Sequence, residues 1–223
     1  MTETEKQNNE TTSRRRAPRF DLMGGPVCLD FINTLDDRFK SEPKELLASY
    51  VDLVRFAEDT GILGSPQVDR LFALSQGSPE AAGRALRAGI QLREAMYAVI
   101  WAVMTNKPVP QGALITLNQY VQAAAQHSFL VQSGLVQAKG RFEWRFEDAA
   151  GNFDAPLWPI ARSAAELLAS EELEFVRACA SETCQWLFLD VSKNHRRRWC
   201  DMTRCGNRAK VRRFYRRKKK GAS

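Results

Sequence analysis

The length, composition and charge of this chain exclude several classes of protein. Its 223 residues and 25.2 kDa fit one ordinary domain with a small module rather than two large domains. With 44% hydrophobic and 26% charged residues, the chain is expected to fold in water, neither disordered nor membrane-spanning. The most apolar run, Ala95 to Met104, is about ten residues long, which is too short to cross a bilayer. No apolar segment follows Arg14 to Arg16, so the N-terminus does not resemble a secretory signal and a cytoplasmic protein is expected.

The positive charge is concentrated at one end of the chain. The formal net charge is +7, but residues 179–223 hold 14 lysines and arginines against three acids, or +11. Residues 1–178 therefore carry 19 basic against 23 acidic residues, or −4. A basic block confined to about a fifth of the chain is typical of a nucleic-acid-binding module, with a solubilising tail as the alternative.

Helical periodicity dominates the middle of the chain. Residues 1–19 are polar and without periodicity, which predicts a mobile arm, and an apolar run follows from Val27 to Leu35. Ser41 and Pro43 predict the start of a helix that Gly61 ends. Apolar spacing and terminating residues predict helices at about residues 43–60, 66–76, 79–105, 111–126 and 156–170.

Between the last two of these helices the apolar period changes from helical to alternating. Phe142, Trp144 and Phe146 alternate with charged residues, and the run from Phe129 to Gln137 could pair with them, which predicts a β-hairpin. The three aromatic residues share one face, and we expect that face to pack in the core. A base-stacking platform is the alternative, which the acidic charge of this part disfavours. The first 178 residues are thus predicted to be mainly α-helical with one hairpin.

Four of the five cysteines form two C-x4-C pairs separated by fifteen residues: Cys179, Cys184, Cys200 and Cys205. Two such pairs can place four thiolates around one tetrahedral Zn²⁺, with residues 186–190 and 196–199 as a strand-turn-strand spacer. Such a site is closed and structural, because no coordination position remains for a catalytic water. Free buried or reactive cysteines are the alternative. His195 is expected to be an exposed turn residue rather than a ligand.

The cysteine segment also carries a family resemblance. Residues 179–213, CASETCQWLFLDVSKNHRRRWCDMTRCGNRAKVRR, closely resemble the CGNR zinc finger, which is named for Cys205, Gly206, Asn207 and Arg208 as they stand here. Upstream, residues 27–38, VCLDFINTLDDR, resemble the opening motif of the ABATE domain. That domain commonly precedes the finger in bacterial proteins described as stress-induced transcription regulators. The resemblance implies a helical ABATE-like domain over residues 20–172 and a strand-turn-strand-helix finger over residues 173–223. It also implies four cysteine ligands to one structural Zn²⁺ in a DNA-binding regulator.

The residues after the last cysteine predict a cationic helix. Residues 206–220 contain no proline, and Val211, Phe214 and Tyr215 form a narrow apolar strip expected to dock on the zinc core. Arginines four residues apart repel each other, so their alignment favours an anionic partner such as phosphate. The residues predicted to contact double-stranded DNA are Arg196, Arg197, Arg198, Arg208, Lys210, Arg212, Arg213, Arg216 and Arg217. As an alternative, Arg208 and residues 196–198 neutralise the zinc thiolates or cap carbonyls of the finger.

In the N-terminal part, polar residues beside the apolar run could serve a sensor. Asn33, Thr34 and Arg38 could line a pocket for an unknown small-molecule effector. The alternative is that Asn33 and Thr34 cap or brace the following segment. His127 and His195 are the only histidines and the sequence has no phosphate-cradling glycine loop, so we expect no enzymatic activity.

Together these features predict a cytoplasmic, nucleoid-associated, non-enzymatic regulator without a membrane partner. The helical part would sense an effector or form a homodimer, and would fold without the finger. A second hypothesis is an interaction protein whose finger binds RNA or acidic proteins. A third is an enzyme that uses an unrecognised pocket in the helical part.

Overall fold

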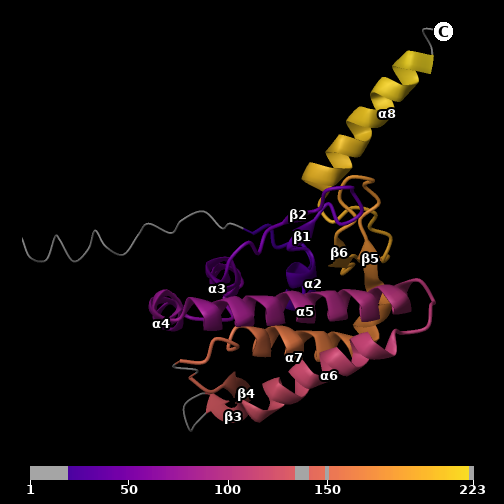
Figure 1. Cartoon of the computed structure of the whole chain (residues 1–223). Helices are drawn as coiled ribbons and strands as arrows, with labels where there is room; N and C mark the ends of the chain where they lie inside the picture. The colour runs from indigo at the N-terminus through magenta and orange to yellow at the C-terminus, as the bar shows by residue number, and fades with distance from the viewer. Residues whose placement is uncertain (1–19, 134–140, 149–150, 221–223) are drawn as a thin grey trace, which may run out of the picture.

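Helices form most of the structure, and short antiparallel strand pairs join them (Figure 1). The computed structural model describes residues 20–133, 141–148 and 151–220, so the predicted N-terminal arm and the hairpin tip lie outside the described residues. The elements of the helical body are α2 (Val27–Ile32), β1 (Leu35–Asp36), β2 (Lys44–Glu45), α3 (Tyr50–Asp59), α4 (Ser65–Gly77), α5 (Pro79–Met104), α6 (Gln111–Gln126), β3 (Ser128–Ser133), β4 (Arg141–Phe146) and α7 (Leu157–Leu168). The C-terminal elements are η1 (Glu171–Phe175), β5 (Val176–Ala178), β6 (Leu187–Leu189), η2 (Met202–Gly206) and α8 (Asn207–Lys220).

The short helix α2 lies at the centre of the core. Its Leu29 and Phe31 are fully buried, and it packs against α5, α7 and β6. Figure 1 shows α5 and α7 running side by side, with α6 against α7 on the side away from α2. Gly89 allows this close packing, because a Cβ there would lie 3.2 Å from Leu157 of α7 and 3.6 Å from Phe31. A larger residue at this position would push the three helices apart.

The mainly α-helical fold class is confirmed, and four of the five expected helices lie close to their predicted positions. The helix expected at residues 43–60 begins only at Tyr50, and residues 44–45 form β2 instead, paired with β1. Glu45 is held in β2 by a buried arginine, Arg93, whose guanidinium contacts both carboxylate oxygens at 2.7 Å. The helix then starts at a capping box, in which Asp52 Oδ2 accepts from the Ser49 N–H at 2.9 Å and from its hydroxyl at 3.0 Å.

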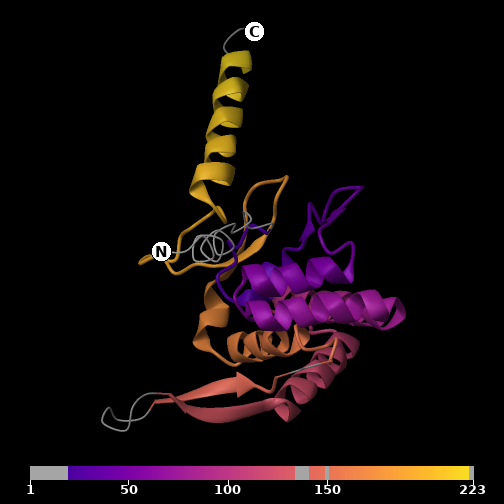
Figure 2. The same cartoon turned by 90° about the vertical axis from the view of Figure 1, so that its left-hand side faces the viewer.

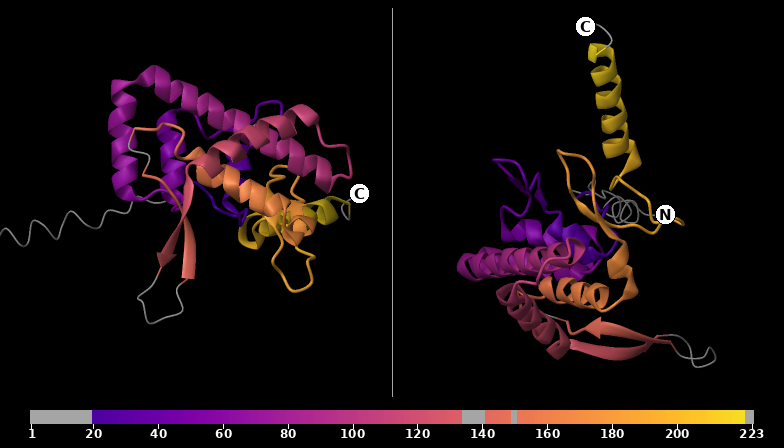
Figure 3. Two further views of the ribbon diagram at one scale, coloured as in Figure 1. Left: turned by 90° about the horizontal axis from the view of Figure 1, so that it is seen from below. Right: turned by 90° about the vertical axis from the view of Figure 1, so that its right-hand side faces the viewer.

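The predicted hairpin is present, but its aromatic face is not packed in the core. β3 and β4 pair in antiparallel register, with Leu130 opposite Trp144. Phe142 and Trp144 are 66% and 54% exposed, so the expectation of a buried stripe is wrong for them. The hairpin contacts α7 near its base, where the Phe146 ring lies 6.3 Å from the Trp158 ring and the Arg162 guanidinium lies 4.5 Å from the centre of the Trp144 ring. Figures 2 and 3 show the rest of the hairpin running away from the helical body.

The finger and the helical body share one hydrophobic core. Val176 of β5 and Leu187 and Leu189 of β6 are buried in the same cluster as the residues of α2. The Leu189 N–H also donates to the carbonyl of Gly24 at 2.8 Å. This shared core argues against the expected independent folding of residues 20–170. None of the helices in the described ranges is long and apolar enough to span a membrane.

Candidate metal centre and nucleic-acid interface

The four clustered cysteines converge from two connections and from η2. Cys179 follows β5 and Cys184 precedes β6, whereas Cys200 precedes η2 and Cys205 lies within it. Their Sγ atoms all lie within 4.8 Å of one another, with 3.6 Å between Cys184 and Cys200 and 3.7 Å between Cys200 and Cys205. A disulfide would need about 2.05 Å, whereas thiolates around a tetrahedral zinc, with Zn–S bonds of about 2.3 Å, lie about 3.8 Å apart. The cluster can therefore bind one Zn²⁺, as the spacing predicted.

Backbone hydrogen bonds hold these cysteines in place. The N–H groups of Cys179, Cys184 and Cys205 donate to carbonyls of Trp186, Ser181 and Asp201 at 2.8, 2.9 and 3.0 Å. Thiol hydrogen bonds from Cys184 and Cys200 lower the pKa of Cys179, and a bound Zn²⁺ would stabilise all four thiolates.

The fifth cysteine lies in a different environment. Cys28 is fully buried in α2 and is not a member of the cluster. Desolvation raises the pKa of its thiol to about 12, which keeps it protonated and inert.

The spacer between the cysteine pairs differs from the expected strand-turn-strand. β6 pairs with β5, and residues 196–199 form no strand. The loop is held instead by the buried carboxylate of Asp190, which accepts from the Ser192 N–H at 3.0 Å, the Ser192 hydroxyl at 2.6 Å and the Arg197 N–H at 2.7 Å. Burial alone would raise the pKa of Asp190, but these hydrogen bonds lower it. A charged carboxylate thus replaces the expected strand pairing.

Arg197 and His195 have structural positions in this loop. Arg197 donates to the carbonyls of Trp199 and Cys200 and lies 4.7 Å from the centre of the Phe188 ring, so it caps the finger as the alternative interpretation proposed. His195 is half-buried rather than exposed, because its ring stacks on Phe175 at 3.8 Å and its Nδ1 lies 2.7 Å from the Asp190 carbonyl. As expected, His195 is not a member of the cysteine cluster.

Two arginines of α8 face the cysteine centre. Arg208 donates to the Cys205 sulfur at 3.4 Å, and Arg212, four residues later, donates to the Thr183 hydroxyl at 3.3 Å. Zn²⁺ with four thiolates carries a formal charge of −2, so a guanidinium at this position offsets it and strengthens the site. This contact supports the neutralising role for Arg208 that the sequence left open.

The rest of α8 stands clear of the body (Figure 1). Phe214 is 64% exposed and Val211 and Tyr215 are exposed as well, so the prediction that this strip docks on the zinc core is wrong. Directly before α8, the buried Gly206 has no space for a side chain, because a Cβ there would clash with Met202 and press on Trp199. Other predicted cations are exposed on the finger and helix: Arg196, Arg198, Lys210 and Arg213. The side chains of Arg216 and Arg217 lie outside the described residues.

The predicted effector residues make protein contacts in this structure. The Asn33 amide bonds to both backbone groups of Leu187 in β6, donating to its carbonyl at 2.8 Å and accepting from its N–H at 2.9 Å. The Asn33 amide makes the two hydrogen bonds that a neighbouring strand would make with Leu187, and so links α2 to the finger. Asn33 thus braces β6, 154 residues further along the chain, rather than the segment that follows it, and no pattern in the sequence indicates this contact.

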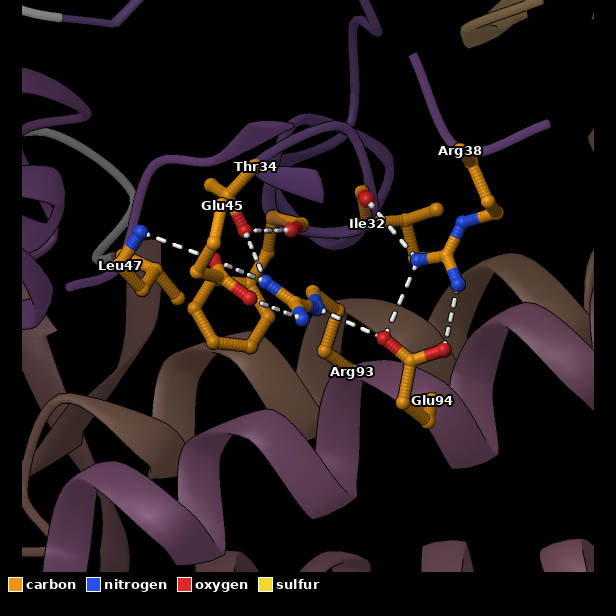
Figure 4. Close-up of polar contacts among 8 residues, drawn as sticks. Ile32, Thr34, Arg38, Glu45, Leu47, Arg93 and Glu94 are labelled. Carbon is orange, nitrogen blue, oxygen red and sulfur yellow. Dashed lines mark hydrogen bonds and ion pairs between the residues drawn. The ribbon is translucent and has the colours of Figure 1, made fainter. Parts of the chain in front are cut away.

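Thr34 and Arg38 belong to a buried ionic network (Figure 4). The Thr34 hydroxyl donates to the Phe31 carbonyl at 2.7 Å and accepts from Arg93, which is 2% exposed. Arg38 pairs with Glu94 and lies 4.1 Å from the centre of the Tyr97 ring. Burial would lower the pKa of Arg93, but Glu45 and Glu94 raise it, so the network stays charged.

A cleft of about 160 Å³ separates the N-terminal segment from the finger beside the cysteines. Its walls include Asp21, Asp36 and Lys40 on one side and Trp186 and Arg204 on the other. Two polar contacts cross it: Trp186 Nε1 donates to Asp36 Oδ1 at 2.7 Å, and Arg204 pairs with Asp21. The cleft is therefore bounded by both parts of the chain.

A cysteine cluster enclosed by two short strands and followed by a basic helix defines a zinc-finger protein. The family pattern described as "Putative stress-induced transcription regulator", named ABATE, matches residues 25–171, and that of the CGNR zinc finger matches residues 176–218. The chain therefore belongs to the ABATE family and carries a C-terminal CGNR zinc finger. No curated protein matches the chain.

Proposed function

We propose that this protein is a non-enzymatic, nucleoid-associated transcription regulator that binds double-stranded DNA through α8 and the exposed arginines of its finger. The observation that carries the proposal is the position of α8, a cationic helix that leaves the body directly after Cys205 and exposes its side chains from Lys210 to Tyr215. An isolated helix with this charge density is stabilised by a polyanion, because the phosphates relieve repulsion between its cations.

The two sides of α8 suggest different roles for its cations. Arg208 and Arg212 contact the finger. Lys210 lies two positions from each of them and is therefore on the opposite side of the helix, and Arg213 follows it at i+3. We assign phosphate contacts to Lys210 and Arg213 and a mainly structural role to Arg208.

The salt dependence of duplex binding tests this assignment. If Lys210 and Arg213 each neutralise one phosphate, the double variant Lys210→Ala/Arg213→Ala should flatten the slope of log affinity against log salt by about two units. The matched control is Arg84→Ala/Arg87→Ala, which removes the same charge from exposed positions on α5. An unchanged slope in the first variant, with zinc retained, would contradict the proposal.

Nucleic-acid selectivity separates a regulator from a general cationic module. A regulator should prefer one duplex sequence over random duplex by a factor of about 10³ or more. Equal binding to duplex DNA, RNA and acidic polypeptides would instead support the interaction-protein hypothesis. Site selection from a random duplex pool, followed by competition with RNA, provides both measurements.

We also propose that the ABATE domain controls the finger through their shared contacts. A ligand that alters the helical body would change the Asn33–Leu187 bonds or the cleft crossed by Trp186, and so move the finger. Thermal-shift measurements with metabolite pools test for such an effector, since a ligand at ~100 times its Kd adds about 2.7 kcal/mol of stability. A hit that stabilises the protein without changing DNA affinity would contradict control of the finger.

A further inference from the structure

The hairpin leaves the outer edges of both its strands open at the end of the molecule opposite α8 (Figures 1 and 2). Within the described residues β3 and β4 form a sheet of only two strands, so the outer edge of β4 has no strand partner. The backbone N–H of Glu147 donates to the carbonyl of His127 at 2.9 Å. The backbone N–H and C=O groups of successive residues point to opposite edges of a strand. Those of Glu143 and Arg145 therefore point toward β3, whereas those of Phe142, Trp144 and Phe146 point outward.

The sequence of β4 is complementary to itself in the antiparallel direction. If two copies of β4 pair about a twofold axis at Trp144, then Glu143 lies opposite the second copy's Arg145, and Phe142 lies opposite the second copy's Phe146. The two tryptophans lie opposite each other on the same face. In this register the charged pairs occupy the non-hydrogen-bonded positions, where opposing side chains are closest.

Neighbouring registers bring like charges together. Shifting the twofold axis to residue 143 places two copies of Glu143 face to face, and shifting it to residue 145 does the same for Arg145. Like charges directly opposite each other destabilise a strand pair, so charge disfavours both registers shifted by one residue from the one centred on Trp144.

A groove adjoins the C-terminal half of β4. An open groove of about 360 Å³ lies beside residues 144–148, bounded across the gap by Ile62, Gln67 and Trp158. Phe142 and Trp144 are exposed in the single chain, although Arg162 of α7 lies over the Trp144 ring, and a second β4 would place apolar side chains beside them. An unprotected edge with aromatic residues is otherwise a liability for a monomer.

We propose that this protein forms a twofold-symmetric homodimer in which the β4 edges pair antiparallel at Trp144, giving a four-stranded sheet in the order β3–β4–β4–β3. The self-complementary charges of Glu143 and Arg145 specify a second copy of this chain as the occupant. This interface lies far from α8, so both basic helices remain open in the dimer (Figure 1). The proposal is independent of DNA binding.

Sedimentation equilibrium of the full chain over a range of concentrations tests the dimer. The wild type should show a monomer–dimer equilibrium, and Glu143→Arg or Arg145→Glu alone should raise the dimer Kd by about tenfold or more, since each substitution places two like-charge pairs in the interface. A wild type that is monomeric at every concentration would overturn the proposal.

Charge reversal then identifies the register. An equimolar mixture of the Glu143→Arg and Arg145→Glu chains should form a heterodimer more tightly than either variant self-associates, because the mixed pairing matches opposite charges again. The chain with both substitutions should recover the wild-type Kd. Zinc content and circular dichroism should remain unchanged in every variant, since β4 lies far from the cysteines. A mixture that associates no more tightly than the separate variants would show that dimers use another surface.

Discussion

At the scale of single residues, Cys184 and Cys28 separate metal binding from packing. The Cys184 sulfur lies within 4.8 Å of the three other clustered sulfurs, whereas Cys28 is isolated in the helical core. We expect Cys184→Ser to lose the one zinc ion bound per chain and to destabilise the finger, because a serine hydroxyl is a poor substitute for a thiolate. Cys28→Ser should retain the zinc. Metal analysis of both purified variants checks this, and a Cys184→Ser protein with full zinc content would contradict the assignment.

Asp30 is a buried carboxyl group whose ionisation opposes folding. It is 6% exposed, and although the Gly24 N–H donates to it at 2.6 Å, desolvation raises its pKa to about 6. Because the folded pKa lies above the unfolded value, the contribution of Asp30 to stability is complete below about pH 4. It is lost as pH rises through the folded pKa, at a cost of about 3 kcal/mol.

The variant Asp30→Asn should lack this pH dependence. We expect wild type to lose stability relative to Asp30→Asn between about pH 4 and pH 7, because only the wild type must ionise a buried group. Urea unfolding of both proteins with saturating zinc measures the difference between their free energies of unfolding at each pH. The pH dependence of metal binding is the same in both proteins and cancels in this difference. Parallel stability curves would show that Asp30 titrates with an ordinary pKa.

At the scale of elements, the contact between α2 and β6 connects the finger to the body. Asn33→Ala would leave the buried N–H and C=O of Leu187 without partners, at a cost of about 1–3 kcal/mol for each group. We therefore expect the free energy of unfolding to fall by about 2–4 kcal/mol. The control is Asn118→Ala on the exposed side of α6, which should change stability by no more than about 0.5 kcal/mol. Equal stabilities of the two variants in urea would contradict the role of Asn33.

Sequence patterns predicted those features of the fold that depend on neighbours in the chain. The spacing of Cys179, Cys184, Cys200 and Cys205 predicted the metal centre, and alternation at residues 142–146 predicted β4. The late start of α3 also has a local signal, since Ser49 and Asp52 form a capping box. Pro43 nevertheless predicted an earlier start of the helix. The strand at Glu45 depends on its pairing with Arg93, which lies 48 positions away, so no neighbouring residue indicates it.

Periodicity could not predict whether an apolar side of a strand or helix is buried by another element. Spacing shows that Phe142 and Trp144 share one side of a strand, and that Val211 and Tyr215 share one side of a helix. It does not show whether another element is within reach, and the hairpin and α8 both extend beyond the body (Figure 2). The contacts of Asn33 and Asp190 were missed for a related reason, because a buried polar side chain has no periodic signature.

At the scale of the whole molecule, the shared core couples zinc binding to the stability of the helices. Val176, Leu187 and Leu189 belong to the finger, yet they complete the core around α2. Burial of each such side chain contributes about 1.5–3 kcal/mol. Loss of zinc should therefore remove several kcal/mol from the helical body as well as unfolding the finger.

Thermal unfolding followed by helical circular dichroism tests this coupling. We expect the zinc-bound protein to unfold in one transition, and a chelator to lower its midpoint by about 10 °C or more, given about 2–4 °C per kcal/mol for a chain of this size. Residues 20–170 expressed alone should show a similarly low midpoint, because they lack the same three side chains. A chelated protein whose helices melt at the original temperature would show instead that the ABATE domain and the finger are stable independently.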